Sequence, residues 1–126
     1  MKILLINPPD ENVIAEAPSE DGKTFLEPED FGMFPPLGLL YVAAYLEEHA
    51  PHHEIKIIDC VGEKCSHNDL VERIAAFAPD VVGVTSFTVS LIDVVLVAES
   101  AKRLNPDVFT VLGGHHPISF PFEAAS

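Results

Sequence analysis

Short apolar runs that alternate with helical segments are the feature of this sequence that most constrains its fold. Four such runs lie at residues 2–7, 54–60, 80–86 and 107–112. The first contains Ile3, Leu4, Leu5 and Ile6 without a polar interruption, which is typical of a strand covered on both faces of a parallel sheet. Strands that alternate with helices form right-handed βαβ units. The sequence therefore predicts an α/β fold: a Rossmann-like, flavodoxin-like doubly wound parallel sheet with strand order 2-1-3-4.

The first predicted helix begins at Pro35 and Pro36 and runs to about His49. Proline suits the first helical turn, where its missing N–H is not needed. One face of this helix is expected to consist of Leu37, Leu40, Tyr41, Ala44 and Tyr45. Because further apolar residues widen that face, we expect the helix to be largely buried.

Capping patterns predict two more helices. Ser66 precedes Asp69 by three positions, and Ser90 precedes Asp93 by the same spacing, as in a capping box. The inward-facing residues expected in the second helix are Leu70, Ile74 and Phe77. Those expected in the third, which runs to Leu104, are Leu91, Val94, Val95, Ala98 and Ala101. A fourth helix can begin at Pro121, after a turn over residues 113–117.

The length of 126 residues fits one domain, over residues 1–126. A complete flavodoxin-like domain adds a fifth strand and a last helix, so we expect this domain to be incomplete at its C-terminal end. The acidic segment of residues 8–35 is long for a connection, and its apolar residues indicate that part of it folds back onto the protein.

The charge of the chain excludes two classes of partner. Seven Lys and Arg stand against 20 Asp and Glu, a formal net charge of −13. Nucleic acids and anionic membranes both require basic surfaces, so neither is expected as a partner, and the acidity favours solubility.

No apolar run approaches the roughly 20 residues of a membrane span, and the start does not resemble a signal peptide. A cytoplasmic location follows, and two cysteines fit a reducing compartment.

Three loops are expected at the carboxyl edge of the sheet, where ligands bind in open α/β folds: residues 7–38, 85–90 and 113–120. In the second loop the hydroxyls of Thr85, Ser86 and Thr88 can either hydrogen-bond a ligand or cap the next helix. In the third, glycines at positions 113 and 114 allow a ligand to approach the backbone, or form an ordinary tight turn.

Other polar residues give weaker indications of a site. Asp59 ends the second strand and can accept a hydrogen bond from a ligand hydroxyl. His115 and His116 are adjacent, so their side chains diverge and make a poor pair of metal ligands. We interpret them as capping or exposed residues. Cys60 and Cys65 lack a Cys-x-x-Cys spacing and are expected to be free thiols rather than zinc ligands.

The sequence lacks the motifs that mark several common functions of α/β domains. Neither Gly-x-Gly-x-x-Gly nor Gly-x-x-x-x-Gly-Lys-Ser/Thr occurs, which argues against dinucleotides and against a P-loop. A receiver domain needs a phosphorylatable Asp after the third strand, where this chain has Thr85, Ser86 and Phe87. No catalytic nucleophile–base pair can be identified from the sequence.

Four segments in order resemble a known family. They are KILLINPP at residues 2–9, FPPLGLLYVAAYL at 34–46, DVVGVTSFT at 80–88 and VLGGHH at 111–116. Together they are similar to the N-terminal domain of cobalamin-dependent radical S-adenosylmethionine (SAM) proteins. That family includes the anaerobic magnesium-protoporphyrin monomethyl ester cyclase and several methyltransferases.

The resemblance implies that cobalamin binds at the carboxyl ends of the strands. Thr85, Ser86 and Phe87 match a Ser-x-Leu element whose hydroxyl meets the nucleotide tail, and the glycine pair matches the place where the tail passes. The first loop and residues 35–38 match the region near the corrin ring. The candidate cofactor-binding residues are Asn7, Pro8, Pro9, Leu37, Gly38, Asp59, Thr85, Ser86, Phe87, Thr88, Gly113, Gly114 and His115.

Two departures from related proteins shape the expected function. The Asp-x-His-x-x-Gly element is absent, so cobalamin is expected without a lower axial histidine. The Cys-x-x-x-Cys-x-x-Cys motif is absent, so the iron–sulfur cluster and SAM are expected only in a downstream catalytic domain. The resemblance thus implies a module without catalytic residues of its own, which presents the corrinoid for methyl transfer or cyclase-type chemistry in a larger radical SAM enzyme.

An alternative remains open, in which the chain is a ligand-free Rossmann-like interaction or regulatory domain. Besides the corrinoid and the downstream domain, a second copy of the chain is a further expected partner, because an exposed sheet edge favours a homodimer.

Overall fold

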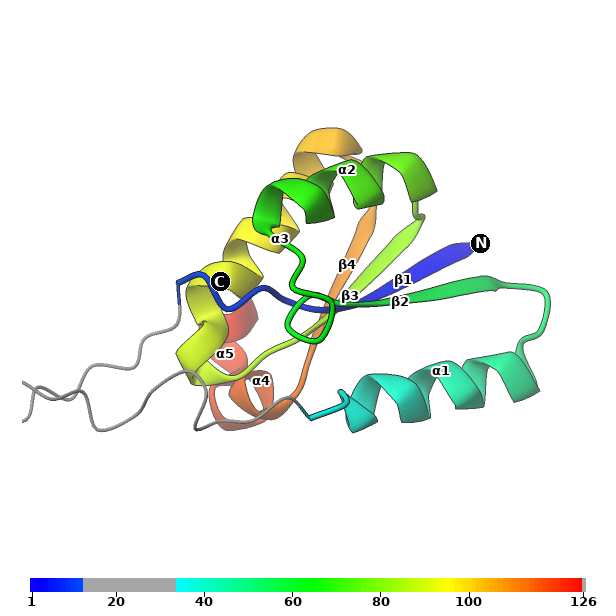
Figure 1. The fold of residues 1–126 in the computed structure, drawn as a ribbon. Coiled ribbons are helices and arrows are strands. Elements are labelled where there is room, and N and C mark those ends of the chain that lie inside the picture. The colour runs from blue at the N-terminus through cyan, green and yellow to red at the C-terminus, as the bar shows by residue number, and fades with distance from the viewer. Residues whose placement is uncertain (13–33, 126) are drawn as a thin grey trace, which may run out of the picture.

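The four predicted strands form one parallel sheet (Figure 1). The structure is a computed structural model that describes residues 1–12 and 34–125. The strands are β1 (Lys2–Asn7), β2 (Glu54–Asp59), β3 (Val81–Thr85) and β4 (Phe109–Gly113). Their order is β2-β1-β3-β4, and every neighbouring pair is parallel. The predicted Rossmann-like fold and the order 2-1-3-4 are therefore confirmed.

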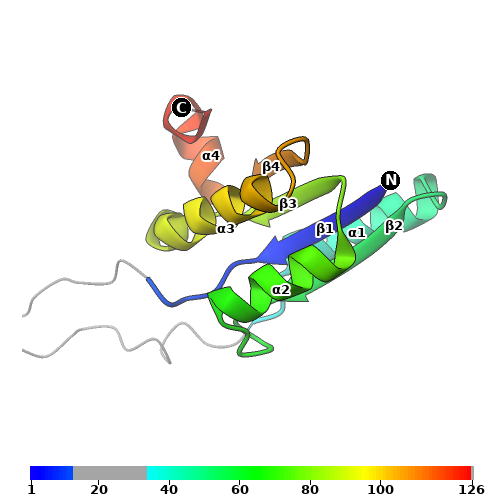
Figure 2. The ribbon, with the colours of Figure 1, turned by 90° about the horizontal axis from the view of Figure 1, so that it is seen from above.

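Helices lie on both faces of the sheet, as a doubly wound fold requires. The helices are α1 (Leu37–His49), α2 (His67–Phe77), α3 (Leu91–Leu104), α4 (His115–Ser119) and α5 (Pro121–Ala125), with a 3₁₀ turn, η2, at Thr88–Ser90. Figures 1 and 2 show α2 and α3 on one face and α1 on the other, with α4 and α5 beyond the carboxyl end of β4. The helix predicted at Pro121 is confirmed. The predicted turn over residues 113–117 is wrong after Gly114, because α4 begins there.

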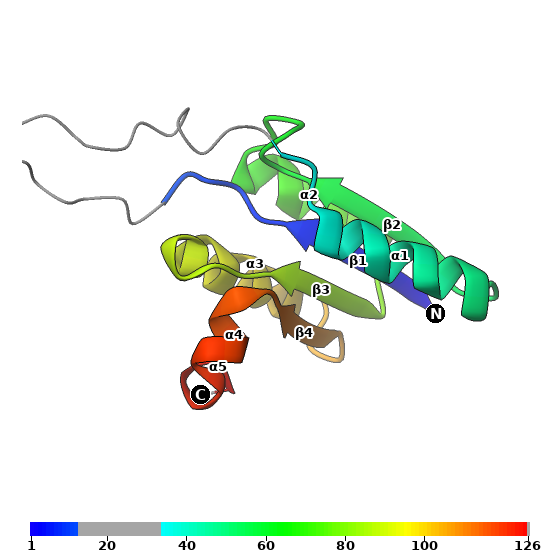
Figure 3. The same cartoon turned by 90° about the horizontal axis from the view of Figure 1, so that it is seen from below.

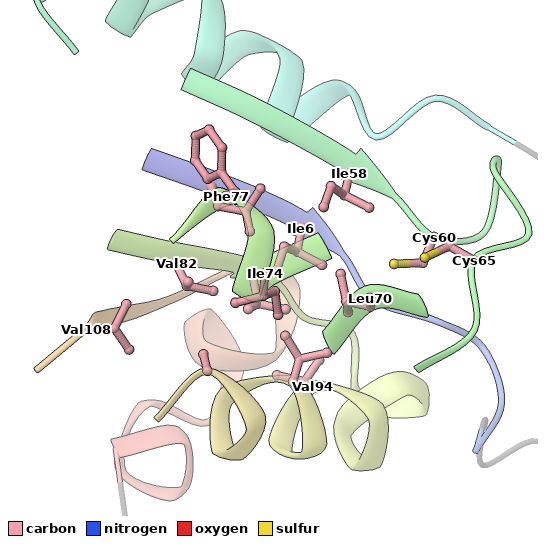
Figure 4. Close-up of a cluster of buried hydrophobic side chains, with 14 residues drawn as sticks. Ile6, Ile58, Cys60, Cys65, Leu70, Ile74, Phe77, Val82, Val94 and Val108 are labelled. Carbon is pink, nitrogen blue, oxygen red and sulfur yellow. The ribbon is translucent and has the colours of Figure 1, made fainter. Parts of the chain in front are cut away.

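The main core lies between the sheet and the α2–α3 face (Figure 4). Strand β1 contributes Leu4 and Ile6, both fully buried. The predicted stripe of α2 is confirmed, since Leu70, Ile74 and Phe77 are all buried. The prediction for α3 is only partly right: Val94 and Ala101 are buried, but Val95 is 48% exposed and Val97 is buried instead. Positions 94, 97 and 101 lie on one side of a helix, because successive residues are 3 or 4 apart.

The prediction that α1 is largely buried is wrong. Only Leu39 and Ala43 are buried, with Leu46 packed beside them, so the helix contacts β1 and β2 through one narrow stripe. The five residues predicted to face inward are all exposed: Leu37, Leu40, Tyr41, Ala44 and Tyr45. An apolar composition along the whole helix hides the helical period, so the sequence alone does not identify the stripe that meets the sheet.

One half of the sheet has no helix over it on the α1 side (Figure 3). Phe109 and Val111 of β4 are 67% and 45% exposed. Strand β4 is also an edge of the sheet. The homodimer expected at such an edge stays a prediction.

Part of the acidic segment of residues 8–35 is expected to fold back onto the protein, and residues 13–33 of that segment lie outside the described residues. Across the residues that are described, no helix has the length and apolar character needed to cross a membrane.

The capping box predicted at the start of α2 is confirmed. The Asp69 backbone N–H donates to Ser66 Oγ over 3.1 Å, and the Ser66 N–H donates to Asp69 Oδ2 over 3.1 Å. These two bonds satisfy two of the free N–H groups at a helix start. The hydrogen bonds from Ser66 also lower the pKa of Asp69.

Removing this cap is expected to destabilise the protein. Ser66→Ala should lower the free energy of unfolding by about 1 kcal/mol near neutral pH, measured by urea denaturation. Ser66→Thr should keep most of the stabilisation that the cap provides. Because the folded-state pKa of Asp69 is lowered, its contribution is present above its unfolded-state pKa and is lost as pH falls through the folded-state pKa. Equal loss in both variants at neutral pH would contradict the cap.

Candidate functional site

A pocket opens at the carboxyl edge of the sheet, between the loops that follow β1, β3 and β4. Its cavity volume is about 620 Å³. It lies where the strand order reverses between β1 and β3, which is the usual ligand position in open α/β sheets. Nine of the candidate residues line it: Asn7, Pro8, Pro9, Leu37, Gly38, Thr85, Phe87, Gly114 and His115.

Four candidate residues do not line the pocket. Asp59 instead accepts hydrogen bonds from Asn7 Nδ2 (2.8 Å) and the Gly62 N–H (3.1 Å). It therefore orients the lining residue Asn7 from outside the pocket. The Thr88 hydroxyl lies 3.2 Å from His116 Nδ1. Ser86 is buried next to the lining residues, and Gly113 is exposed.

Sequence reasoning missed several residues that line the pocket: Asp10, Phe34, Leu39, Val61, Val89 and Ser90. Val61 lies outside the three loops expected at this edge, but it follows β2 and so reaches the same edge. The others lie in the expected loops or at the start of α1, and the sequence pattern does not reveal which of their side chains turn towards the pocket.

Gly114 brings the β3 and β4 loops into close contact. A Cβ at this position would lie 2.6 Å from the carbonyl oxygen and 2.8 Å from the nitrogen of Ser86, and φ is +93°. The Ser86 N–H donates to the Gly113 carbonyl (2.8 Å), and the His116 N–H donates to the Ser86 carbonyl (3.1 Å). Only glycine leaves space for this approach, whereas a Cβ on Gly113 would meet nothing within 4 Å.

Ser86 carries an unpaired polar atom next to the pocket. The residue is fully buried, and its hydroxyl has no hydrogen-bond partner among the described residues. An unpaired buried hydroxyl costs about 1–3 kcal/mol, so such groups are usually paired with protein, water or ligand. His116, predicted to be capping or exposed, is in fact buried. Its Nε2 atom likewise has no hydrogen-bond partner among the described residues.

The loop after β1 is anchored by a buried carboxylate. Asp93 is fully buried, and its two carboxylate oxygens accept from the Asn12 N–H and from Asn12 Nδ2, each over 2.9 Å. The predicted Ser90–Asp93 capping box is therefore wrong, because Ser90 makes no side-chain cap bond to α3 and contacts Phe87 instead. This anchor holds the chain just beyond Pro8, Pro9 and Asp10, which line the pocket.

The pocket lining is mainly apolar. Its ionisable members are Asp10 and His115, and the His115 ring packs against Phe87 with a centroid separation of 5.2 Å. Within residues 1–12 and 34–125, no group of three or more His, Cys, Asp or Glu side chains is placed to hold a metal ion. An apolar pocket with a few polar groups suits a large organic ligand.

Comparisons with known proteins agree with this geometry. The B12 binding domain family matches residues 31–126. An uncharacterized methyltransferase of Pyrococcus horikoshii is 39% identical over 116 residues, covering 92% of this chain and 22% of that protein. An anaerobic magnesium-protoporphyrin IX monomethyl ester cyclase of Rubrivivax gelatinosus is 33% identical over 85 residues, 68% of this chain and 15% of that protein. A cytidylyl-2-hydroxyethylphosphonate methyltransferase of Streptomyces wedmorensis is 33% identical over 104 residues, 68% of this chain and 19% of that protein.

No solved structure matches the chain. The chain spans less than a quarter of the length of these curated relatives, since the largest share is 22%. The family match covers most of the chain, including the loops after β3 and β4. The chain therefore belongs to the B12 binding domain family and is homologous to the N-terminal parts of B12-dependent radical SAM methyltransferases and of the anaerobic magnesium-protoporphyrin cyclase.

Proposed function

We propose that this chain binds cobalamin in the pocket at the carboxyl edge of its sheet and presents it to a radical SAM catalytic domain of a longer protein. The observation that supports this most directly is the buried, unpaired hydroxyl of Ser86 beside the Gly114 contact. A polar group without a partner, next to an apolar pocket, fits a ligand that brings its own hydrogen-bond acceptor.

Each part of the pocket has a proposed role. The Ser86 hydroxyl would donate to the nucleotide tail, and Gly114 would keep the passage beside it free of side chains. The apolar residues Pro8, Pro9 and Leu37 would contact the corrin ring and exclude water from it. Asp59 would keep the Asn7 amide oriented towards the pocket through its 2.8 Å hydrogen bond.

The bound cofactor would supply the reactive cobalt centre, as a methyl carrier or an electron-transfer partner. His115 is the histidine that lines the pocket, and it packs on Phe87. We propose that cobalamin binds without a lower axial histidine, in keeping with the missing Asp-x-His-x-x-Gly element. The iron–sulfur cluster, SAM and the choice of substrate then belong to the catalytic domain.

Retention of hydroxocobalamin tests the proposal. The protein is mixed with the cofactor, freed of unbound cofactor by gel filtration, and examined by visible spectroscopy. We expect corrin absorbance to elute with the protein. Elution of colourless protein would favour the alternative, a ligand-free interaction domain.

A single substitution tests the role of Ser86. Because its buried hydroxyl has no partner, Ser86→Ala should raise the free energy of unfolding of the ligand-free protein by about 1 kcal/mol or more. The same change should weaken hydroxocobalamin binding about tenfold, because it removes one hydrogen bond to the ligand. Affinities are measured by spectroscopic titration.

Cobinamide, which lacks the nucleotide tail, provides the control ligand for this experiment. Its affinity should be equal for the original protein and for Ser86→Ala, and Ser119→Ala, an exposed position of α4, should change neither ligand's affinity. An equal loss of cobinamide affinity in Ser86→Ala would show that the hydroxyl does not contact the tail.

A further inference from the structure

Cys60 and Cys65 form a buried pair of thiols at the two ends of the β2–α2 loop. They are 2% and 8% exposed, and neither takes part in a disulfide. Figure 4 shows their sulfur atoms next to each other, and the Cys65 thiol donates to the Ser66 carbonyl over 3.6 Å. The Cys65 N–H also donates to the Cys60 carbonyl over 2.9 Å. Such a bond holds the two Cα atoms near the separation that a disulfide spans, about 4.4–6.8 Å.

The loop between the thiols has a tightly fixed conformation. A Cβ on Gly62 would overlap the Asp59 carboxylate, and Lys64 has a positive φ of 51°. The Gly62 N–H donates to Asp59 Oδ1 (3.1 Å), and the Glu63 N–H donates to the Asp59 carbonyl (2.9 Å). The loop thus holds the thiols together before any bond forms between them, which reduces the cost of closing a disulfide.

The surroundings distinguish the two thiols chemically. Burial, and then the neighbouring Cys65, raise the pKa of Cys60 far above its ordinary value, so this thiol stays protonated. Cys65 is the more exposed of the two residues, at 8% against 2%. The thiolate is the attacking species in disulfide exchange, so a thiol that is held in its protonated form is a poor first nucleophile. Cys65 is therefore suited to react first and Cys60 second.

We propose that Cys60 and Cys65 are a redox modification site that forms a reversible intraloop disulfide by exchange with a small-molecule disulfide such as oxidised glutathione. The Cys65 thiolate attacks one sulfur of the oxidised glutathione, which forms a mixed disulfide and releases one glutathione thiolate. Cys60 then displaces the second glutathione, and its proton passes to the departing thiolate. The protein dithiol is oxidised, and one oxidised glutathione is reduced to two glutathione molecules.

This disulfide would close the loop that carries Val61, a residue that lines the pocket. The chemistry itself does not depend on a bound corrinoid, so it can be tested on the ligand-free protein.

The test incubates the folded protein with an excess of oxidised glutathione and then measures mass and free thiols. We expect the monomer to lose two hydrogens in mass and both of its titratable thiols, and to regain them with dithiothreitol. The melting temperature of the oxidised form should rise by about 5 °C or more, because the disulfide restricts the unfolded chain.

Single variants separate the two steps. Cys60→Ser leaves Cys65 without a resolving partner, so it should accumulate one stable glutathione adduct. Cys65→Ser leaves only the protonated, buried Cys60 and should remain largely unmodified under the same conditions. Two persistent free thiols in the folded protein, or a disulfide-linked dimer on a non-reducing gel, would overturn the proposal.

Discussion

Replacing Gly114 by alanine is expected to lower the free energy of unfolding by about 2–4 kcal/mol and to abolish retention of hydroxocobalamin. Its φ of 93° and ψ of −166° fall in a backbone region that is essentially restricted to glycine, at a cost of about 1–3 kcal/mol for other residues. An added Cβ would also lie 2.6 Å from the Ser86 carbonyl oxygen, so the β3 and β4 loops would have to separate. Urea denaturation measures the first effect and gel filtration with the cofactor the second.

The preceding glycine provides the matched control. A Cβ on Gly113 would meet nothing within 4 Å, so Gly113→Ala should change the free energy of unfolding by no more than about 0.5 kcal/mol. It should also retain the corrinoid. Equal effects of the two substitutions would mean that the close contact at Gly114, and with it the passage proposed for the nucleotide tail, is not what the glycine pair provides.

The strands were predictable because their pattern has a direct physical cause. A strand between two others in a parallel sheet is apolar throughout, and β1, with Ile3 to Ile6 all buried, has that pattern. The capping box of α2 was likewise visible in the sequence, since both of its partners lie within one turn. Strand β4 has a similar apolar pattern, yet Phe109 and Val111 are exposed. An apolar run indicates that a residue can be buried, and does not reveal whether anything covers it.

The site was predictable at the level of loops, and less so at the level of residues. The rule that ligands bind at the carboxyl ends of strands brought together Asn7, Thr85 and Gly114, which all line the pocket. The rule does not say which side chain turns inward, so Asp59 was included although it supports Asn7 from outside the pocket. Contacts between distant parts of the chain have no local signal. The pairing of Asn12 with Asp93, 81 positions apart, is therefore visible only in the structure.

That pairing leads to the second large expected effect. Asp93→Ala should lower the free energy of unfolding by about 2–4 kcal/mol, because it removes two hydrogen bonds to a charged carboxylate. It should also weaken hydroxocobalamin binding, since the segment with Pro8 and Pro9 loses its anchor. Urea denaturation and spectroscopic titration measure the two effects.

Two further variants distinguish the anchor from a general effect of charge on α3. Glu99 lies on the same helix and forms an exposed ion pair with Arg103 at 3.5 Å, so Glu99→Ala should cost less than about 0.5 kcal/mol. Asn12→Ala removes only the side-chain donor, and combining it with Asp93→Ala should be less than additive by about 1 kcal/mol or more, because both changes remove the same contact. Strict additivity would mean that the Asn12 side chain contributes nothing through Asp93. In that case the loop after β1 would owe its position to the packing of Pro8 and Pro9, which are both buried.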